Sequence, residues 1–100
     1  MIFDEADKKR KHHVLIIFDV TNDKRRRTLT KALKSFGIRI QKSAFECILD
    51  VYQYDRLVVR LKKTINKEED ILKIYRFTDR VETITIGNMK EVEDEEFEIL

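Results

Sequence analysis

The feature that most constrains the fold of this 100-residue chain is an uninterrupted apolar run near its start. Residues 13–20 have the sequence HVLIIFDV, in which positions of both parities are apolar until the aspartate at position 19. Such a composition is typical of a strand at the centre of a sheet, where both faces are covered. Residues 13–20 therefore predict a central strand that must be covered on two sides.

Helical periodicity appears twice after this strand. Between residues 22 and 36 the apolar residues recur at helical spacing, Thr21, Asn22 or Asp23 can cap the start, and Gly37 is suited to end the helix. A second amphipathic helix is indicated by the spacing of Tyr54, Leu57, Val58, Leu61 and Ile65. The chain therefore has two predicted helices, each with one apolar stripe.

Three further stretches predict strands. Residues 38–49 alternate in part but change parity, so we predict one strand with a bulge at residues 42–44. Residues 71–77 and 81–86 predict two more strands. We interpret the set as the α+β, ferredoxin-like βαββαβ arrangement, an antiparallel sheet with both helices on one face.

This architecture leaves the second face of the sheet uncovered. Leu15 and Ile17 would lie there, and the chain has no third helix to cover them. We therefore expect a homodimer in which two copies pack sheet against sheet. Near the end, Phe97, Ile99 and Leu100 alternate with acids and are candidates for an extra strand at the edge of the partner's sheet.

Charge is segregated along the sequence although the net charge is only +2. We divide the chain into a charged N-terminal extension (1–12), a single domain (13–88) and an acidic C-terminal segment (89–100). Lysine and arginine are concentrated in the first half, which predicts a cationic face suited to phosphate. The alternative, ordinary solvated helix surfaces, stays open.

Composition excludes several classes of site. With Cys47 as its only cysteine, the chain can form no intramolecular disulfide and no cysteine-rich zinc site. Its apolar runs are too short to span a bilayer, and its charged start has no signal cleavage site. His12 and His13 are adjacent, so on an extended chain their rings diverge. We expect a cytoplasmic protein without a membrane segment.

Two motifs, in the right order, resemble those of a known family. The first, FDVTNDKRR at residues 18–26, resembles an apolar strand ending in aspartate followed by a basic helix start. The second, GIRIQKSAFE at residues 37–46, resembles a glycine, basic, Gln, Ser, aromatic, Glu pattern. With Ile74-Tyr75 and Thr85-Ile86-Gly87, the similarity covers roughly residues 13–88, a length of one domain. The chain resembles the small CRISPR-associated "Cas-two" endonucleases, whose members usually begin their first strand much closer to Met1.

The resemblance implies a metal-dependent endonuclease for RNA or DNA that takes part in spacer acquisition with the CRISPR integrase. Asp19 matches the strand-end aspartate, which makes it the catalytic and metal-binding candidate. Two copies in the dimer would hold Mg²⁺ or Mn²⁺. Without the resemblance, an aspartate there is typically a turn or cap residue. Two alternatives remain: a non-catalytic DNA-bridging scaffold dimer of the integration complex, and a toxin-like ribonuclease on the same fold.

Phosphate contact is assigned to four cations, because arginine grips phosphate bidentately. These nucleic-acid-binding candidates are Arg25, Arg26, Arg39 and Lys42. Their alternative role is intramolecular pairing with Glu46 or Asp23. Three residues have supporting roles: Ser43 as a hydrogen-bonding group, Phe45 as a core aromatic and Asp23 as a capping residue.

Overall fold

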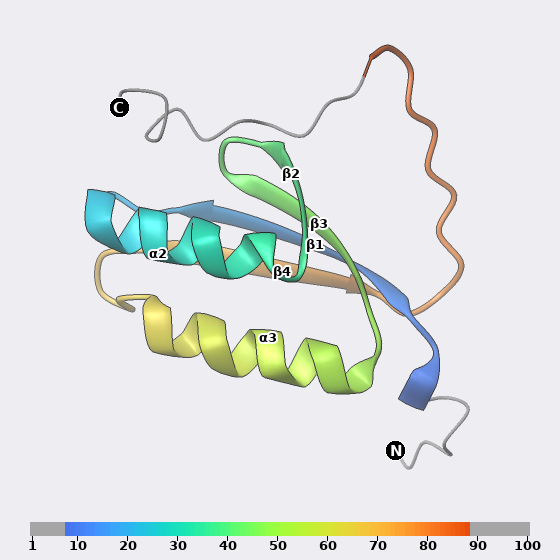
Figure 1. The fold of residues 1–100 in the computed structure, drawn as a ribbon, viewed down its shortest axis with the longest axis horizontal. Helices are drawn as coiled ribbons and strands as arrows, with labels where there is room; N and C mark the ends of the chain where they lie inside the picture. Colours follow the sequence, from blue (N-terminus) through green and yellow to red (C-terminus); the bar gives the residue numbers. More distant parts are fainter. Residues whose placement is uncertain (1–7, 89–100) are drawn as a thin grey trace.

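The structure, a computed structural model, describes residues 8–88 and contains one four-stranded sheet with two helices. The elements are β1 (His12–Asp19), α2 (Asp23–Lys34), β2 (Gly37–Gln41), β3 (Ala44–Leu49), α3 (Val51–Thr64) and β4 (Ile71–Phe77). All paired strands are antiparallel and the order across the sheet is β2-β3-β1-β4 (Figure 1). This order is the ferredoxin-like βαββαβ arrangement, so the predicted fold class is confirmed, with residues 13–20 in an interior strand.

Both helices begin at side chains that cap them. Of the three candidates for the first cap, it is Asn22 whose side chain accepts a hydrogen bond from the Arg25 N–H at 2.8 Å. Asp50 and Gln53 form a reciprocal capping box at the start of α3. The box explains why α3 begins at Val51, before the first apolar residue of the predicted stripe. Within the described residues 8–88, neither helix is long and apolar enough to cross a membrane.

The core lies between the two helices and one face of the sheet. Alternate residues of β1 and β3 face it, together with the apolar stripes of α2 and α3. Phe18 and Phe45 stack there with their ring centroids 6.3 Å apart. Full burial of each such side chain stabilises the fold by roughly 1.5–3 kcal/mol. The largest fully buried residues are Phe45, Ile16, Leu29, Leu33, Leu57, Leu61, Val14 and Cys47.

The predicted bulged strand at residues 38–49 is instead a hairpin. Lys42 and Ser43 form a two-residue turn between β2 and β3, and Gln41 pairs with Ala44 across it. The apolar parity changes because Ile38 lies on the side of the sheet away from the helices, whereas Phe45 and Cys47 are buried beneath them, a pattern that a bulge within one strand would also produce. The irregularity in the ladder falls between Arg39 and Gln41, ahead of the turn.

Gly37 begins β2 because no side chain fits at this position. A Cβ there would collide with the backbone oxygen of Glu46 and the sulfur of Cys47. The close approach of the two strands therefore requires glycine.

The strand predicted at residues 81–86 is not formed in the structure. These residues follow β4 without pairing to any described strand, and the side chains of Ile84 and Ile86 are 76% and 93% exposed. The physical reason is that a strand needs a partner for its backbone groups, and the chain folds without providing one here. The candidate extra strand at Phe97, Ile99 and Leu100 lies outside the described residues.

The second face of the sheet is uncovered within residues 8–88. Directly opposed residues of β1 and β4 share this side, including Leu15 with Tyr75 and Asp19 with Ile71. We call it the open face. Its most exposed large apolar side chains have 41–59% of their surface in water, and they are Ile17, Ile38, Ile48, Ile71, Tyr75 and Phe77. The expectation that one parity of β1 lacks a cover within the chain is therefore confirmed.

Candidate nucleic-acid and metal site

Asp19 is the last residue of β1 and lies on the open face. Its neighbours Phe18 and Val20 are buried toward the helices, whereas Asp19 alternates to the opposite side and is exposed. The antiparallel register places it across from Ile71 at the start of β4. The end of a buried strand thus fixes the position of a carboxylate that remains accessible to solvent.

One chain does not complete a metal site around Asp19. Residues 8–88 contain no group of three or more His, Cys, Asp or Glu side chains that could hold an ion. The carboxylate itself has the hard oxygen chemistry that Mg²⁺ or Mn²⁺ prefers. The donor type therefore fits the expected metal, and within residues 8–88 one chain does not group further acidic, histidine or cysteine ligands with it.

Arg25 forms an ion-pair cluster with the loop that precedes β4. Its guanidinium donates to both carboxylate oxygens of Asp70 at 2.5 and 2.9 Å and to Glu69 at 2.8 Å. The Asp70 side chain has no exposed surface and also accepts a hydrogen bond from the Asn66 N–H. Arg25 is therefore a structural link between α2 and the start of β4, with partners different from the predicted Glu46 or Asp23.

This cluster shifts the pKa values of both partners. The hydrogen bond from Arg25 holds the pKa of Asp70 below its usual range, against the opposing effect of burial. The hydrogen bond to Asp70, followed by the one to Glu69, raises the pKa of Arg25. Both groups are consequently charged at neutral pH.

Arg26 and Asp23 pair with each other in the first turn of α2. The Arg26 guanidinium lies 2.7 Å from the Asp23 carboxylate and donates to the Val20 carbonyl oxygen at 3.4 Å. Here the predicted alternative of pairing with Asp23 is found. The Arg26 side chain still has 33% of its surface exposed, so it lies at the surface near the end of β1.

Arg39 is buried, with 7% of its surface exposed. Its Nε and Nη2 donate to the Lys42 carbonyl oxygen at 3.1 and 2.6 Å, and its guanidinium lies 6.0 Å from the centroid of the Phe45 ring. Nη1 has no hydrogen-bond partner among the described residues. Arg39 therefore holds the hairpin turn rather than extending from the surface.

The hairpin turn itself lies beside the end of β1. Lys42 and Ser43 are exposed, and the Ser43 carbonyl oxygen accepts a hydrogen bond from the Phe18 N–H at 3.0 Å. Phe45 is fully buried against Phe18 on the helix side of the sheet, as expected for a core aromatic. It therefore lies away from the open face, where it could not contact a second sheet.

The structure thus gathers Asp19, Arg26, Lys42 and Ser43 at one end of the sheet and directs Arg25 and Arg39 inward. Sequence reasoning missed Asp70, which lies in the polar stretch between α3 and β4. No local signal could have identified it, since Arg25 and Asp70 are 45 positions apart. The functional roles of the gathered residues stay predictions.

Cys47 and His12 lie away from this end of the sheet and do not belong to the site. Cys47 is buried, and burial followed by the charge of Glu46 raises the pKa of its thiol to about 11. Burial, Arg10 and Arg76 lower the pKa of His12. The Cys47 thiol is therefore not an activated nucleophile at neutral pH. His12 belongs to no cluster of possible metal ligands within residues 8–88.

Comparison with known proteins places the chain in one family. The family model described as CRISPR associated protein Cas2 matches residues 12–83. A relative from Thermus thermophilus, named CRISPR-associated endoribonuclease Cas2, is 38% identical over 92 residues, covering 88% of this chain and 98% of the relative.

Solved structures agree with this assignment. A hypothetical protein from Thermus thermophilus superposes with a TM-score of 0.67 at 34% identity, covering 79% of this chain and 96% of that one. A chain from a structure described as a partial Cas6-RT-Cas1--Cas2 complex has a TM-score of 0.57 at 35% identity, covering 65% and 77%. From the family match and these relatives together, the chain belongs to the CRISPR associated protein Cas2 family.

Proposed function

We propose that this protein is a homodimeric, metal-dependent endonuclease that takes part in CRISPR spacer acquisition together with integrase subunits. The observation that carries the proposal is the position of Asp19, exposed at the end of β1 and on the open face. Relatives named as endoribonucleases and a relative solved in a complex with Cas1 support the activity and the partner.

The apolar character of the open face supports the homodimer. Six exposed large apolar side chains on this face come from all four strands and leave 41–59% of their surface in water. Covering such a surface with a copy of itself is favourable, and a two-fold axis places identical residues opposite each other. A two-fold axis that runs parallel to the strands within this interface brings the two Asp19 carboxylates to a common end of it.

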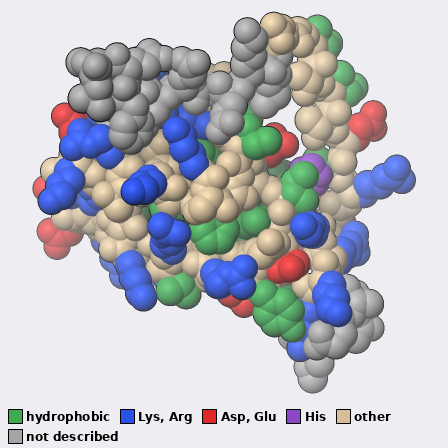
Figure 2. Space-filling model, in the orientation of Figure 1, with side chains coloured by type: hydrophobic (Ala, Val, Ile, Leu, Met, Phe, Trp, Pro, Cys, Tyr) green, Lys and Arg blue, Asp and Glu red, His purple; other side chains and the backbone are tan. Residues whose placement is uncertain are grey.

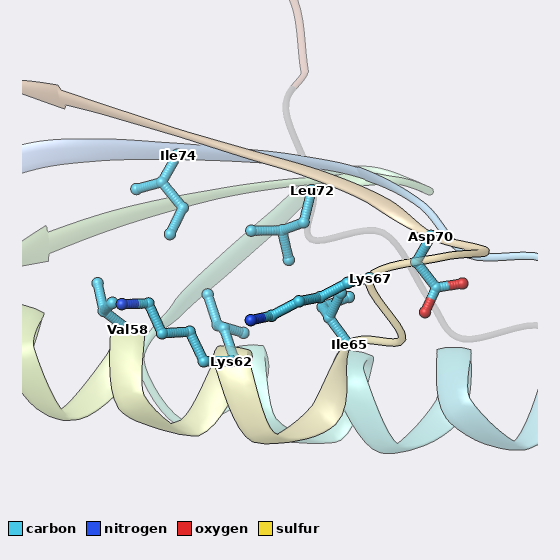
Figure 3. A pocket seen from close by; sticks show the side chains of 8 residues that line it. Val58, Lys62, Ile65, Lys67, Asp70, Leu72 and Ile74 are labelled. Atoms are coloured by element: carbon cyan, nitrogen blue, oxygen red, sulfur yellow. The ribbon is translucent and has the colours of Figure 1, made fainter.

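The free edge of β4 gives the dimer a second contact. β4 is an edge strand, and beside it a groove of about 340 Å³ lies between its residues Leu72 and Ile74 and Val58 of α3 (Figure 3). Within residues 81–86, Thr83 and Thr85 alternate with the exposed Ile84 and Ile86, which suits a strand that adds to such an edge. We infer that this segment of each protomer pairs with β4 of its partner.

The chemistry follows from the residues at the Asp19 end of the sheet. A bound Mg²⁺ or Mn²⁺ supplies an activated water and stabilises charge on the phosphate. Asp19 from each protomer provides the carboxylate oxygens that hold the ion. Arg26 and Lys42, at the same end of the sheet, are placed to contact the phosphodiester backbone, so binding is expected to weaken with salt.

Cleavage assays with Asp19→Asn test the proposal. We expect wild-type protein to cut labelled single-stranded RNA or double-stranded DNA only with Mg²⁺ or Mn²⁺, and the variant to lose roughly a hundredfold or more in rate. Asp55→Asn, which removes an exposed carboxylate on α3, is the matched control and should cut normally. Cleavage that persists in EDTA, or in Asp19→Asn, would contradict the proposal.

A DNA-bridging scaffold is the second candidate. It is favoured by the lack of a metal-ligand cluster around Asp19 within residues 8–88. In this case neither protein cuts, and Asp19→Asn supports spacer integration by the integrase subunits as well as wild type does. Loss of integration in Asp19→Asn together with loss of cleavage would favour the enzyme.

A further inference from the structure

The groove beside β4 is apolar and lies on the helix side of the sheet. It has a volume of about 340 Å³ and runs between α3 and β4 (Figure 3). β4 is an edge strand, and no strand within residues 8–88 pairs with its outer edge. The groove is therefore open along the edge of the sheet. Its floor is formed by five apolar side chains, which are Val58, Leu61, Ile65, Leu72 and Ile74.

Two lysines border this groove. Lys62 of α3 and Lys67 of the loop after it line the groove, and Figure 3 shows both side chains lying along it. Within residues 8–88, neither lysine has an ion pair. The acid that lines the groove, Asp70, already accepts hydrogen bonds from Arg25. The groove therefore suits a ligand that combines apolar groups with negative charge.

The chain itself contains a segment with this composition, outside the described residues. Residues 91–100 read EVEDEEFEIL, in which six positions are acidic. Near the end, Phe97 and Ile99 alternate with Glu96 and Glu98. On an extended chain, successive side chains point to opposite sides, so one side of this run is apolar and the other is acidic. An apolar floor bordered by lysines is complementary to such a segment.

We propose that residues 95–100 of the partner protomer dock in this groove. Phe97 and Ile99 contact its apolar floor, and the glutamates beside them pair with the two lysines. A volume of about 340 Å³ is at the lower end of the roughly 300–1,000 Å³ that is typical of pockets for small ligands. The groove therefore suits a few side chains of an extended segment and is too small for a folded domain.

The proposed dimer brings this segment to the groove. All strand pairs in the sheet are antiparallel. If residues 81–86 of the partner add to β4 in the same sense, they end beside Ile71, next to the Asp70 end of the groove. From there, about ten extended residues reach up to about 33 Å, whereas the α3 side of the groove, residues 58–65, spans about 10 Å. The segment is therefore long enough to follow the groove.

Within one chain, the same segment starts from the other side of the sheet. Thr85, Ile86 and Asn88 line a hollow together with Ile40 and Gln41 of β2. β2 is the edge strand opposite β4, so the end of the described chain is far from its own groove. The partner's segment fits the groove more directly. The inference therefore rests on the proposed homodimer, but not on cleavage.

Positive charge alone does not single out the groove. Figure 2 shows lysine and arginine side chains spread over the face of the molecule on which the helices lie, so an acidic segment is attracted to that whole side. The apolar residues of the segment are what favour the groove. Two adjacent valines of α3 separate the two effects. Val58 lines the groove, whereas Val59 does not and is 53% exposed.

The test cross-links the whole chain through an introduced pair of cysteines. Leu100→Cys is combined with Val58→Cys in one variant and with Val59→Cys in the other. A short bis-maleimide reagent joins the thiols, because a disulfide would demand a narrower range of separations. Native Cys47 is buried and the pKa of its thiol is raised to about 11, so it should not compete. Denaturing gels separate single chains from cross-linked dimers, and mass spectrometry identifies the joined peptides.

We expect Val58→Cys to cross-link to Leu100→Cys of another chain roughly tenfold or more faster than Val59→Cys does, because docking raises the local concentration of the two thiols. Adding Lys62→Glu and Lys67→Glu to the Val58→Cys variant should slow the reaction by roughly threefold to tenfold, because the ion pairs are lost and the acids are repelled.

A matched charge reversal controls for net charge. Lys24→Glu with Lys34→Glu makes the same change on α2, at exposed positions that do not line the groove. Added to the Val58→Cys variant, it should slow cross-linking by less than about twofold.

Each of the other outcomes contradicts the inference. Equal rates from Val58→Cys and Val59→Cys would mean that charge attracts the segment without docking it in the groove. A cross-link from Val58→Cys within one chain would mean that the segment is not exchanged. Without any cross-link, sedimentation of the same variant separates two failures. A dimer would mean that the groove does not hold this segment, and a monomer would mean that the proposed homodimer itself is wrong.

Discussion

The two faces of the central sheet differ in how completely one chain buries their apolar side chains. On β1, Val14, Ile16 and Phe18 point toward the helices and have at most 3% of their surface exposed. The residues between them point to the open face, where Ile17 is 41% exposed and Asp19 is accessible. Adjacent residues of one strand thus alternate between a core that one chain buries completely and a surface that it leaves exposed.

This difference teaches where to look for function in so small a protein. The helix-covered side is a packed core that a single chain completes, so its residues serve stability. The open face combines apolar side chains that need a cover with a carboxylate that needs a second donor. Both needs are met by one event, the pairing of two copies, so assembly and chemistry are expected to depend on each other.

The largest effect that tests this comparison is expected from two adjacent isoleucines. Ile16→Ala removes a fully buried side chain and should lower the free energy of unfolding by about 2–5 kcal/mol. Ile17 is one residue away on the open face, and Ile17→Ala should lower the free energy of unfolding far less at concentrations where the protein is monomeric. Urea unfolding of dilute protein measures both, and equal losses would remove the distinction between the faces.

A smaller effect is expected when charge is placed on the open face. Ile17→Asp puts a carboxylate into the proposed dimer interface and should weaken dimerisation by roughly 100-fold, about 3 kcal/mol, because an unpaired charge would be buried. The variant should remain folded. Sedimentation over a range of concentrations gives the result, with Val59→Asp on exposed α3 as the matched control. A wild-type protein that stays monomeric would contradict the interface.

The smallest effect concerns acid stability at the end of the covered side, where Arg25 holds Asp70. Because the folded-state pKa of Asp70 lies below its unfolded value near 4, the pair adds stability above that value and loses it as pH falls through the folded pKa. Asp70→Asn should therefore be clearly less stable than wild type at about pH 7, and the difference should shrink below about pH 4.

Urea midpoints at the two pH values measure this prediction. Glu69→Gln is the control, because Glu69 is 58% exposed and its loss should matter less. A difference between wild type and Asp70→Asn that is independent of pH would show that the ion pair is not its cause.

The covered side was predictable from sequence for a physical reason. Strand alternation and helical spacing both report burial within one chain, so the positions of Ile16, Leu29 and Leu57 follow from the apolar pattern. The hairpin was harder to predict from the sequence, because its turn is Lys42-Ser43 and contains neither the glycine nor the asparagine that is typical of such turns. The local apolar pattern therefore predicted the helices and most of the strands, but not the boundary between β2 and β3.

The candidate site was only partly predictable. Asp19 was identified as a candidate through the resemblance of residues 18–26 to a family motif, and the structure puts it on the open face. The inward orientation of Arg25 and Arg39 depends on contacts with Asp70 and with the Lys42 carbonyl oxygen, which local sequence does not encode. Residues 81–86 have the pattern of a strand, but the edge that we infer for them belongs to another copy.

The measurement that tests the central claim most directly is cleavage by mixtures of wild-type and Asp19→Asn protein after subunit exchange, at constant total concentration. If the open faces join two Asp19 carboxylates in one site, only dimers with two wild-type protomers are active. Activity should then fall as the square of the wild-type fraction. A linear fall would mean that each chain acts with its own Asp19 and would contradict a site shared across the dimer.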